Sequence, residues 1–228
     1  MHPALPPPRL VIFDCDGVLI DSEVISANML IVELAGYGVA MDMDFVSRHF
    51  LGRSYPVVLS EVRTRFGVAL PEHFEADYRS RLLAAFQRDL KVMPGVREAI
   101  LDLALPYCLA TSSSPERVRQ SLVLAGLTDL FGPRIYTASQ VSRGKPAPDL
   151  FLFAARQMGA APAECLVIED SVIGVKAARA AGMQVWRFIG GSHLAGRIAE
   201  EPADSCPDGR FASFADFYDV VPGMRRAS

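Results

Sequence analysis

The chain has 228 residues, of which 50% are hydrophobic and 21% are charged, a composition typical of a folded protein with a substantial core. Its 23 lysine and arginine residues do not outnumber its 26 aspartate and glutamate residues, so we expect no nucleic-acid partner and no anionic membrane surface. No uncharged apolar run approaches the ~20 residues of a transmembrane helix. The four widely spaced cysteines favour a reducing compartment. We therefore expect a cytoplasmic monomer whose partner is a small molecule.

The first predicted elements are a strand and a run of helices. Residues 1–8 are rich in proline and are predicted to form a flexible arm. The apolar run 10–13 predicts a buried strand that ends before the turn at Gly17. Apolar residues then recur at helical spacing, which predicts helices from Ser22 to about Gly36, from about Ser54 to Phe66 and from Pro71 onward. Residues 22–90 are thus predicted to form an inserted, all-helical cap domain.

Strands and helices alternate from residue 91 to the C-terminus. Apolar runs predict strands at 107–111, around 135–136, at 166–168 and at 184–188. Helical patterns separate them, at about 95–104, 115–126, 149–158 and 172–181. This alternation is typical of a doubly wound, parallel α/β sheet. We expect one core domain made of residues 9–21 and 91–228.

Two carboxylates follow the first predicted strand. Asp14 and Asp16 lie two residues apart, just before Gly17. Ligands of open α/β sheets bind at the carboxyl ends of the strands, so both acids are placed where a ligand is expected. Because gathering anionic groups there is costly unless a cation offsets their repulsion, the pattern predicts a metal ion.

Three later sites share this position in the predicted sheet. Thr111 and Ser112 lie where a strand gives way to a helix, a natural phosphate site, although an ordinary serine helix cap is the alternative. Lys145 lies on a proline-stiffened loop and could hold a phosphoryl group or neutralise an aspartate; a solvated surface lysine is the alternative. Glu169 and Asp170 form a second acidic pair, although Asp170 could simply cap the next helix.

Four segments, FDCDGVLIDS, YCLAT, GKPAPD and LVIEDS, resemble the four motifs of the haloacid dehalogenase-like hydrolase superfamily, in the same order. The predicted helical insertion resembles the small cap of that superfamily. The segment AGMQVWRFIGG is similar to its β-phosphoglucomutase-like and sugar-phosphatase branch. The resemblance covers residues 9 to about 195.

The resemblance implies a Rossmann-like core and a role for each matching residue. Asp14 would be the nucleophile that forms an aspartyl phosphate, and Asp16 would be the general acid and base. The metal would be Mg²⁺, with ligands from Asp14, from the backbone carbonyl of Asp16, and from Asp170, and with Glu169 beside it. The implied phosphate-binding residues are Thr111, Ser112 and Lys145.

Specificity would come from the cap. Gly52, Arg53 and Ser54 form the candidate contact loop, in which Arg53 could grip an anionic or hydroxyl-rich part of the substrate. Glu23 could bind sugar hydroxyls. Alternatively, Arg53 is simply an exposed residue at a helix start. Glu23 could stand at a helix N-terminus only because an acid there interacts favourably with the helix dipole.

The leading hypothesis is a Mg²⁺-dependent phosphatase that acts on a small phosphorylated metabolite, a sugar or sugar-acid phosphate. A phosphomutase of the β-phosphoglucomutase type is an alternative, although Ser26 stands where that type carries a histidine. A dehalogenase is disfavoured because Asp16 is present, and a phosphonoacetaldehyde hydrolase because residues 22–90 contain no lysine. A non-catalytic phosphoacceptor module is a further alternative, disfavoured by Asp16 and by the helical insertion.

Overall fold

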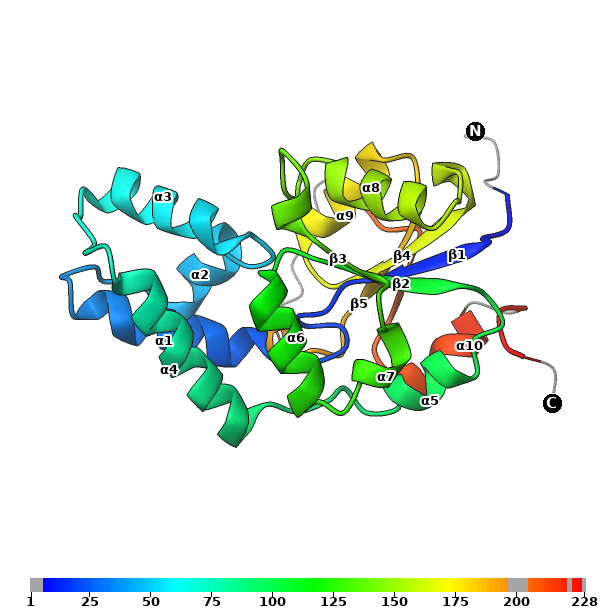
Figure 1. The fold of residues 1–228 in the computed structure, drawn as a ribbon, viewed down its shortest axis with the longest axis horizontal. Helices are drawn as coiled ribbons and strands as arrows, with labels where there is room; N and C mark the ends of the chain where they lie inside the picture. The colour runs from blue at the N-terminus through cyan, green and yellow to red at the C-terminus, as the bar shows by residue number, and fades with distance from the viewer. Residues whose placement is uncertain (1–5, 197–204, 221–222, 227–228) are drawn as a thin grey trace.

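The computed structural model describes residues 6–196, 205–220 and 223–226. Their centre is a parallel sheet in the order β3-β2-β1-β4-β5-β6 (Figure 1). The strands are β1 (Leu10–Phe13), β2 (Tyr107–Thr111), β3 (Ile135–Thr137), β4 (Cys165–Glu169), β5 (Gln184–Phe188) and β6 (Gly209–Phe211). Every neighbouring pair is parallel, which confirms the predicted fold class.

Helices cover both faces of this sheet. Because successive side chains of a strand point to opposite faces, β1 sends Leu10 and Ile12 into one apolar cluster and Val11 and Phe13 into the other. One cluster is covered by α8 (Asp149–Gln157) and α9 (Val172–Ala180). The opposite cluster is covered by α5 (Val96–Leu101), α6 (Pro115–Leu124), α7 (Thr128–Phe131) and α10 (Phe217–Val220).

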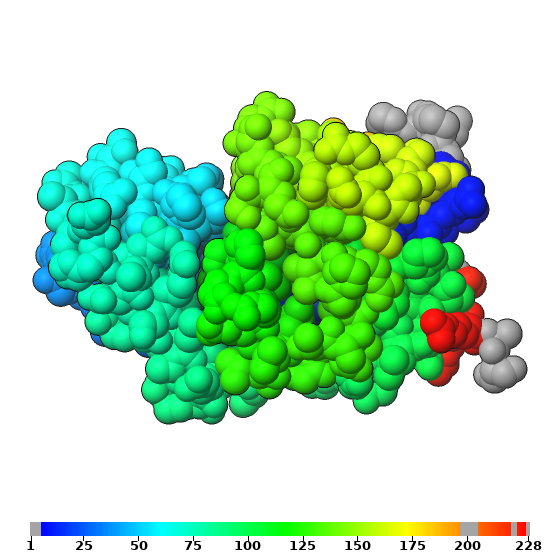
Figure 2. Space-filling model, in the orientation of Figure 1, coloured from blue at the N-terminus to red at the C-terminus, as the bar shows by residue number. Residues whose placement is uncertain are grey.

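A group of consecutive helices lies beyond the carboxyl ends of the strands (Figure 1). These helices are α1 (Glu23–Ala35), α2 (Met43–His49), α3 (Tyr55–Phe66) and α4 (Phe74–Asp89). They pack around an apolar cluster of their own, which includes Leu34, Val62 and Leu82. We refer to residues 23–89 as the helical insertion. Figure 2 shows it as a lobe beside the sheet layers.

The structure adds four short elements to those predicted, namely α2, α7, α10 and β6, and it shortens one predicted helix. Helix α2 spans only two turns, too few for an apolar period to stand out, and the Asp42 side chain caps it by accepting a hydrogen bond from Phe45 N (2.7 Å). Strand β6 has three residues and pairs with β5 at the sheet edge. The helix expected to reach about residue 104 ends at Leu101.

Two predictions concern the chain ends and the membrane. Residues 1–5 of the predicted N-terminal arm lie outside the described residues, whereas the carbonyl of Pro6 accepts a hydrogen bond from Gln184 Nε2 (2.6 Å). Within the described ranges, none of the helices combines the length and apolarity that a bilayer crossing requires.

Candidate active site

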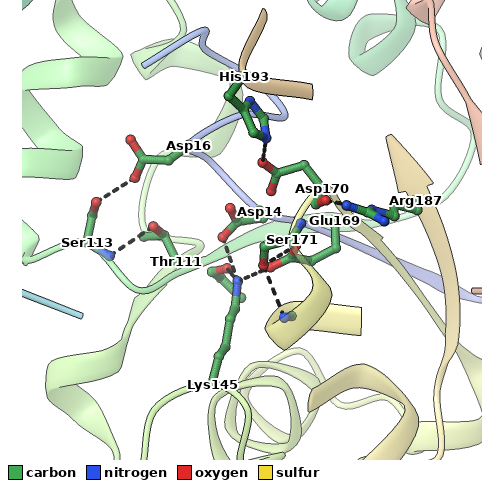
Figure 3. A network of polar contacts seen from close by, with 12 residues as sticks. Asp14, Asp16, Thr111, Ser113, Lys145, Glu169, Asp170, Ser171, Arg187 and His193 are labelled. Carbon is green, nitrogen blue, oxygen red and sulfur yellow. Dashed lines mark hydrogen bonds and ion pairs between the residues drawn. The ribbon is translucent and has the colours of Figure 1, made fainter. Parts of the chain in front are cut away.

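The chemistry-bearing residues gather at the carboxyl edge of the sheet (Figure 3). Asp14 follows the last residue of β1, Thr111 ends β2 and Glu169 ends β4. A cavity of about 240 Å³ lies between this edge and the helical insertion, and it is lined from both sides. Because the parallel strands end at one edge of the sheet, residues that are distant in sequence line one cavity.

Lys145 links two of the carboxylates inside the protein. Its Nζ donates hydrogen bonds to Asp14 Oδ1 (2.7 Å) and Glu169 Oε1 (2.8 Å), and all three side chains are buried. The ammonium group also lies 4.8 Å from the centre of the Phe151 ring. Burial lowers the pKa of Lys145, but the two adjoining carboxylates raise it by more, so the lysine stays charged.

Glu169 is fixed by the start of helix α9. Its Oε2 accepts hydrogen bonds from Ser171 N (2.6 Å) and Ser171 Oγ (2.9 Å). Gly174, one turn into the helix, leaves the space that this carboxylate fills, because a Cβ there would lie 1.7 Å from Glu169 Oε1. Ser171 rather than Asp170 caps α9, since its hydroxyl accepts from Gly174 N, so Asp170 is not needed as the helix cap.

Asp16 is held by donors from three segments. Its Oδ1 accepts from Ser22 Oγ (2.5 Å) and Arg117 Nη2 (2.8 Å), and its Oδ2 accepts from Ser113 Oγ (2.6 Å). Figure 3 shows Asp16 turned toward Ser113 and away from Lys145. Burial raises the pKa of Asp16, but Arg117 and the two hydroxyls outweigh this effect, and the pKa lies below its usual value.

The hydroxyl side chains at the end of β2 and just after it differ in their hydrogen-bond partners. Ser114 caps α6 by accepting from Arg117 N (3.4 Å), so the other hydroxyls are not needed as caps. Thr111 Oγ1 accepts from Ser113 N (3.1 Å), and Ser112 Oγ is buried without a hydrogen-bond partner among the described residues. Both Thr111 and Ser112 line the cavity, close to the N–H groups that begin α6.

The four cap residues singled out from the sequence also line the cavity, namely Glu23, Gly52, Arg53 and Ser54. Gly52 has a φ of 74° and approaches Ser171 so closely that a Cβ would lie 2.6 Å from the serine Oγ. This loop of the insertion therefore reaches down to the start of α9. Burial and the nearby Asp16 and Asp170 raise the pKa of Glu23 to about 8.

A family model of the haloacid dehalogenase-like hydrolases matches residues 8–182. The chain belongs to this family. It is 27% identical over 184 residues to the 6-phosphogluconate phosphatase of Escherichia coli (80% of this chain, 83% of that protein) and 34% identical over 190 residues to the probable pseudouridine-5'-phosphatase of Drosophila melanogaster (76% and 78%). A solved family hydrolase from Deinococcus radiodurans, described with bound phosphate and sodium, superposes with a TM-score of 0.72 at 32% identity (97% of this chain, 99% of that one).

In this haloacid dehalogenase-like hydrolase, three carboxylates suit a cation. Oxygens of Asp14, Glu169 and Asp170 lie within 4.8 Å of one another and are buried. Burial raises the pKa of Asp14 and of Asp170, and the neighbouring carboxylates raise both further, because Lys145 alone does not balance three anions. Oxygen ligands of this kind suit Mg²⁺. The donor set therefore fits a hard divalent cation.

Besides Ser22 and Ser113, two further residues with no role in the sequence-based prediction contact the site in this hydrolase. His193, in the 3₁₀ turn after β5, places Nε2 2.9 Å from Asp170 Oδ2, and both side chains are buried. Arg117 of α6 pairs with Asp16. The position of His193 beyond a strand's carboxyl end was a usable signal. For Arg117 there was no such signal in the sequence, because a basic residue in a helix is usually solvated.

Proposed function

We propose that this hydrolase is a Mg²⁺-dependent phosphatase that acts on a small phosphorylated metabolite, a sugar or sugar-acid phosphate, through an aspartyl phosphate on Asp14. The observation that carries the proposal is the buried arrangement of Asp14, Lys145 and Asp170, in which Asp14 lines the same cavity as Asp16. When bound, Mg²⁺ would supply positive charge to the phosphoryl oxygens and to Asp14 and Asp170.

In the first step, a carboxylate oxygen of Asp14 attacks phosphorus while the bond from phosphorus to the ester oxygen breaks. Lys145 favours the ionised form of the attacking carboxylate and holds it in place through its 2.7 Å hydrogen bond. Asp16, in its protonated form, donates a proton to the leaving oxygen, which departs as an alcohol. Because Arg117 and two hydroxyls hold the pKa of Asp16 below its usual value, Asp16 must take up this proton before the step. The products of this step are the alcohol and phosphorylated Asp14.

In the second step, water attacks phosphorus and gives a proton to Asp16. The bond between phosphorus and Asp14 breaks, so the Asp14 carboxylate and the Asp16 proton are both restored as inorganic phosphate leaves. Thr111, Ser112 and the N–H groups at the start of α6 would hold the non-bridging oxygens, and the unpartnered Ser112 hydroxyl supports this role.

The helical insertion would select the substrate. Arg53 lines the cavity and forms no ion pair with the residues that the structure describes, so its guanidinium is available to an anionic or hydroxyl-rich group. Glu23, with its raised pKa, could donate a hydrogen bond to a sugar hydroxyl or accept one from it. The name of the Escherichia coli relative, a 6-phosphogluconate phosphatase, supports a sugar-acid phosphate as one candidate.

Phosphate release tests this proposal across a panel of sugar, sugar-acid, polyol and nucleotide phosphates, with Mg²⁺ and with EDTA. We expect release that requires the metal and is lost in Asp14→Asn. Replacing Arg53 by methionine should change the order of preference within the panel more than the rate on a generic aryl phosphate. Isomerised sugar phosphate without inorganic phosphate, or full activity in Asp14→Asn, would contradict the proposal.

A further inference from the structure

We propose that Arg117 is a positioning residue that fixes the carboxylate of Asp16 at the cavity; the proposal rests on the acid–base role proposed above for Asp16. Arg117 lies in α6, and its Nη2 donates to Asp16 Oδ1 at 2.8 Å. The pair is largely screened from solvent, with side-chain exposures of 19% for Arg117 and 13% for Asp16. The attraction between the two charges in this environment is screened less by water and salt than in a surface salt bridge.

The guanidinium group is itself held in place from the helical insertion. The same Nη2 donates to Ser26 Oγ of α1 (3.1 Å), and the guanidinium carbon lies 5.4 Å from the centre of the Phe86 ring of α4. Arg117 thus joins the sheet-covering helix α6 to two helices of the insertion. Because its position depends on both sides of the cavity, it ties the direction of the Asp16 carboxylate to the placement of the insertion.

The other donors to Asp16 do not replace the arginine. Ser22 and Ser113 approach the two different oxygens, and each hydroxyl can rotate about its own bond. The planar guanidinium is the only charged donor to this carboxylate among the described contacts. Burying a guanidinium group without a partner is costly. The Nε of Arg117 has no hydrogen-bond partner among the described residues, so the pair with Asp16 compensates for the burial of this group.

The leaving group of the substrate separates positioning of a proton donor from a general structural role. Nitrophenolate is a stable anion and departs without a proton, whereas phenolate is a poorer leaving group and gains from a proton donor. The value of kcat/KM reports the steps up to formation of phosphorylated Asp14. We therefore compare kcat/KM for 4-nitrophenyl phosphate and for phenyl phosphate, using Mg²⁺-loaded full-length enzyme.

We expect Arg117→Met to lower kcat/KM for phenyl phosphate roughly 10²-fold, the cost of a misplaced catalytic group, with little change for 4-nitrophenyl phosphate. Asp16→Asn should show the same selectivity with a larger loss, up to ~10⁴-fold. Arg117→Lys, which keeps the charge but not the planar fork, should recover part of the phenyl phosphate activity. Arg119→Met, two residues further along α6 at an exposed position, is the matched control and should behave as the wild type.

Equal losses on both esters, or no loss in Arg117→Met, would overturn the positioning role. Circular dichroism and thermal denaturation identify a variant that fails to fold, in which case Arg117→Lys decides the question by the same selectivity. Hydrolysis that persists in Asp14→Asn would overturn the proposed function itself, and the role of Arg117 with it. These two failures are therefore distinguishable.

Discussion

At the scale of single residues, few positively charged side chains lie close to the carboxylates of the site. Lys145 forms ion pairs with both Asp14 and Glu169, and Arg117 forms an ion pair with Asp16. Asp170 has only His193 as a side-chain partner among the described contacts, and its backbone carbonyl accepts from Arg187 Nε (2.7 Å). The carboxylate of Asp170 is thus oriented by an imidazole and is otherwise free for a cation.

This geometry predicts that His193→Ala weakens metal binding about 10- to 100-fold, the usual cost of removing a group that orients a metal ligand. His193→Gln, whose amide nitrogen can take the place of Nε2, should retain more of the affinity. Calorimetric titration of the metal-free protein with Mg²⁺ measures both. His73→Ala, at an exposed position before α4, is the control. Wild-type affinity in His193→Ala would show that the histidine has no part in the metal site.

The residues that the sequence could place are those at strand ends. Asp14, Thr111, Lys145 and Asp170 follow apolar runs or turn signals, and parallel pairing brings such positions to one edge. The contacts of Arg117 and His193 could not be predicted in this way, because they depend on side-chain directions across elements, although the position of His193 beyond a strand end was a usable signal. Ser22 illustrates the point: it stands at the start of α1, as predicted, but its hydroxyl bonds Asp16 rather than capping the helix.

At the scale of elements, the long apolar patterns and the short strand β3 were predictable, whereas several other short elements were not. Helix α3 ends at Phe66 as expected, since Gly67 takes the left-handed φ of 63° that stops it. Helix α2 and strand β6 are too short for periodicity to identify, and they form because neighbouring elements supply their partners. Tertiary contacts rather than local preference therefore decide the elements that the sequence analysis missed.

At the scale of the whole molecule, the buried carboxylates make stability depend on pH and on the cation. In metal-free protein the pKa values of Asp14 and Asp170 are raised by burial and by neighbouring anions. Both groups are neutral below their unfolded pKa of about 3.9, where folding carries no penalty from them. As pH rises through the raised pKa values of the folded protein, both groups ionise among buried anions, and the free energy of unfolding falls.

We therefore predict that, in EDTA, Asp170→Asn raises the free energy of unfolding near neutral pH, because it removes a carboxylate whose ionisation is opposed by burial and by neighbouring anions. The variant should also lose most of the stabilisation that Mg²⁺ gives the wild type. Denaturant unfolding with and without Mg²⁺, at mildly acidic and at neutral pH, measures both effects. Asp129→Asn is the control, because its exposed carboxylate is paired with Arg97 and its pKa is lowered. A less stable Asp170→Asn protein in EDTA would contradict this electrostatic account.

The most direct test of the account is to trap phosphate on Asp14. Asp16→Asn should still react with 4-nitrophenyl phosphate, whose leaving group needs no proton, but should lack the base for the second step. We predict that acid-quenched protein carries one phosphoryl group on the peptide containing Asp14, that hydroxylamine removes it, and that Asp14→Asn never acquires it. Steady turnover with no phosphorylated Asp14 at any quench time, or a label on another residue, would contradict the account.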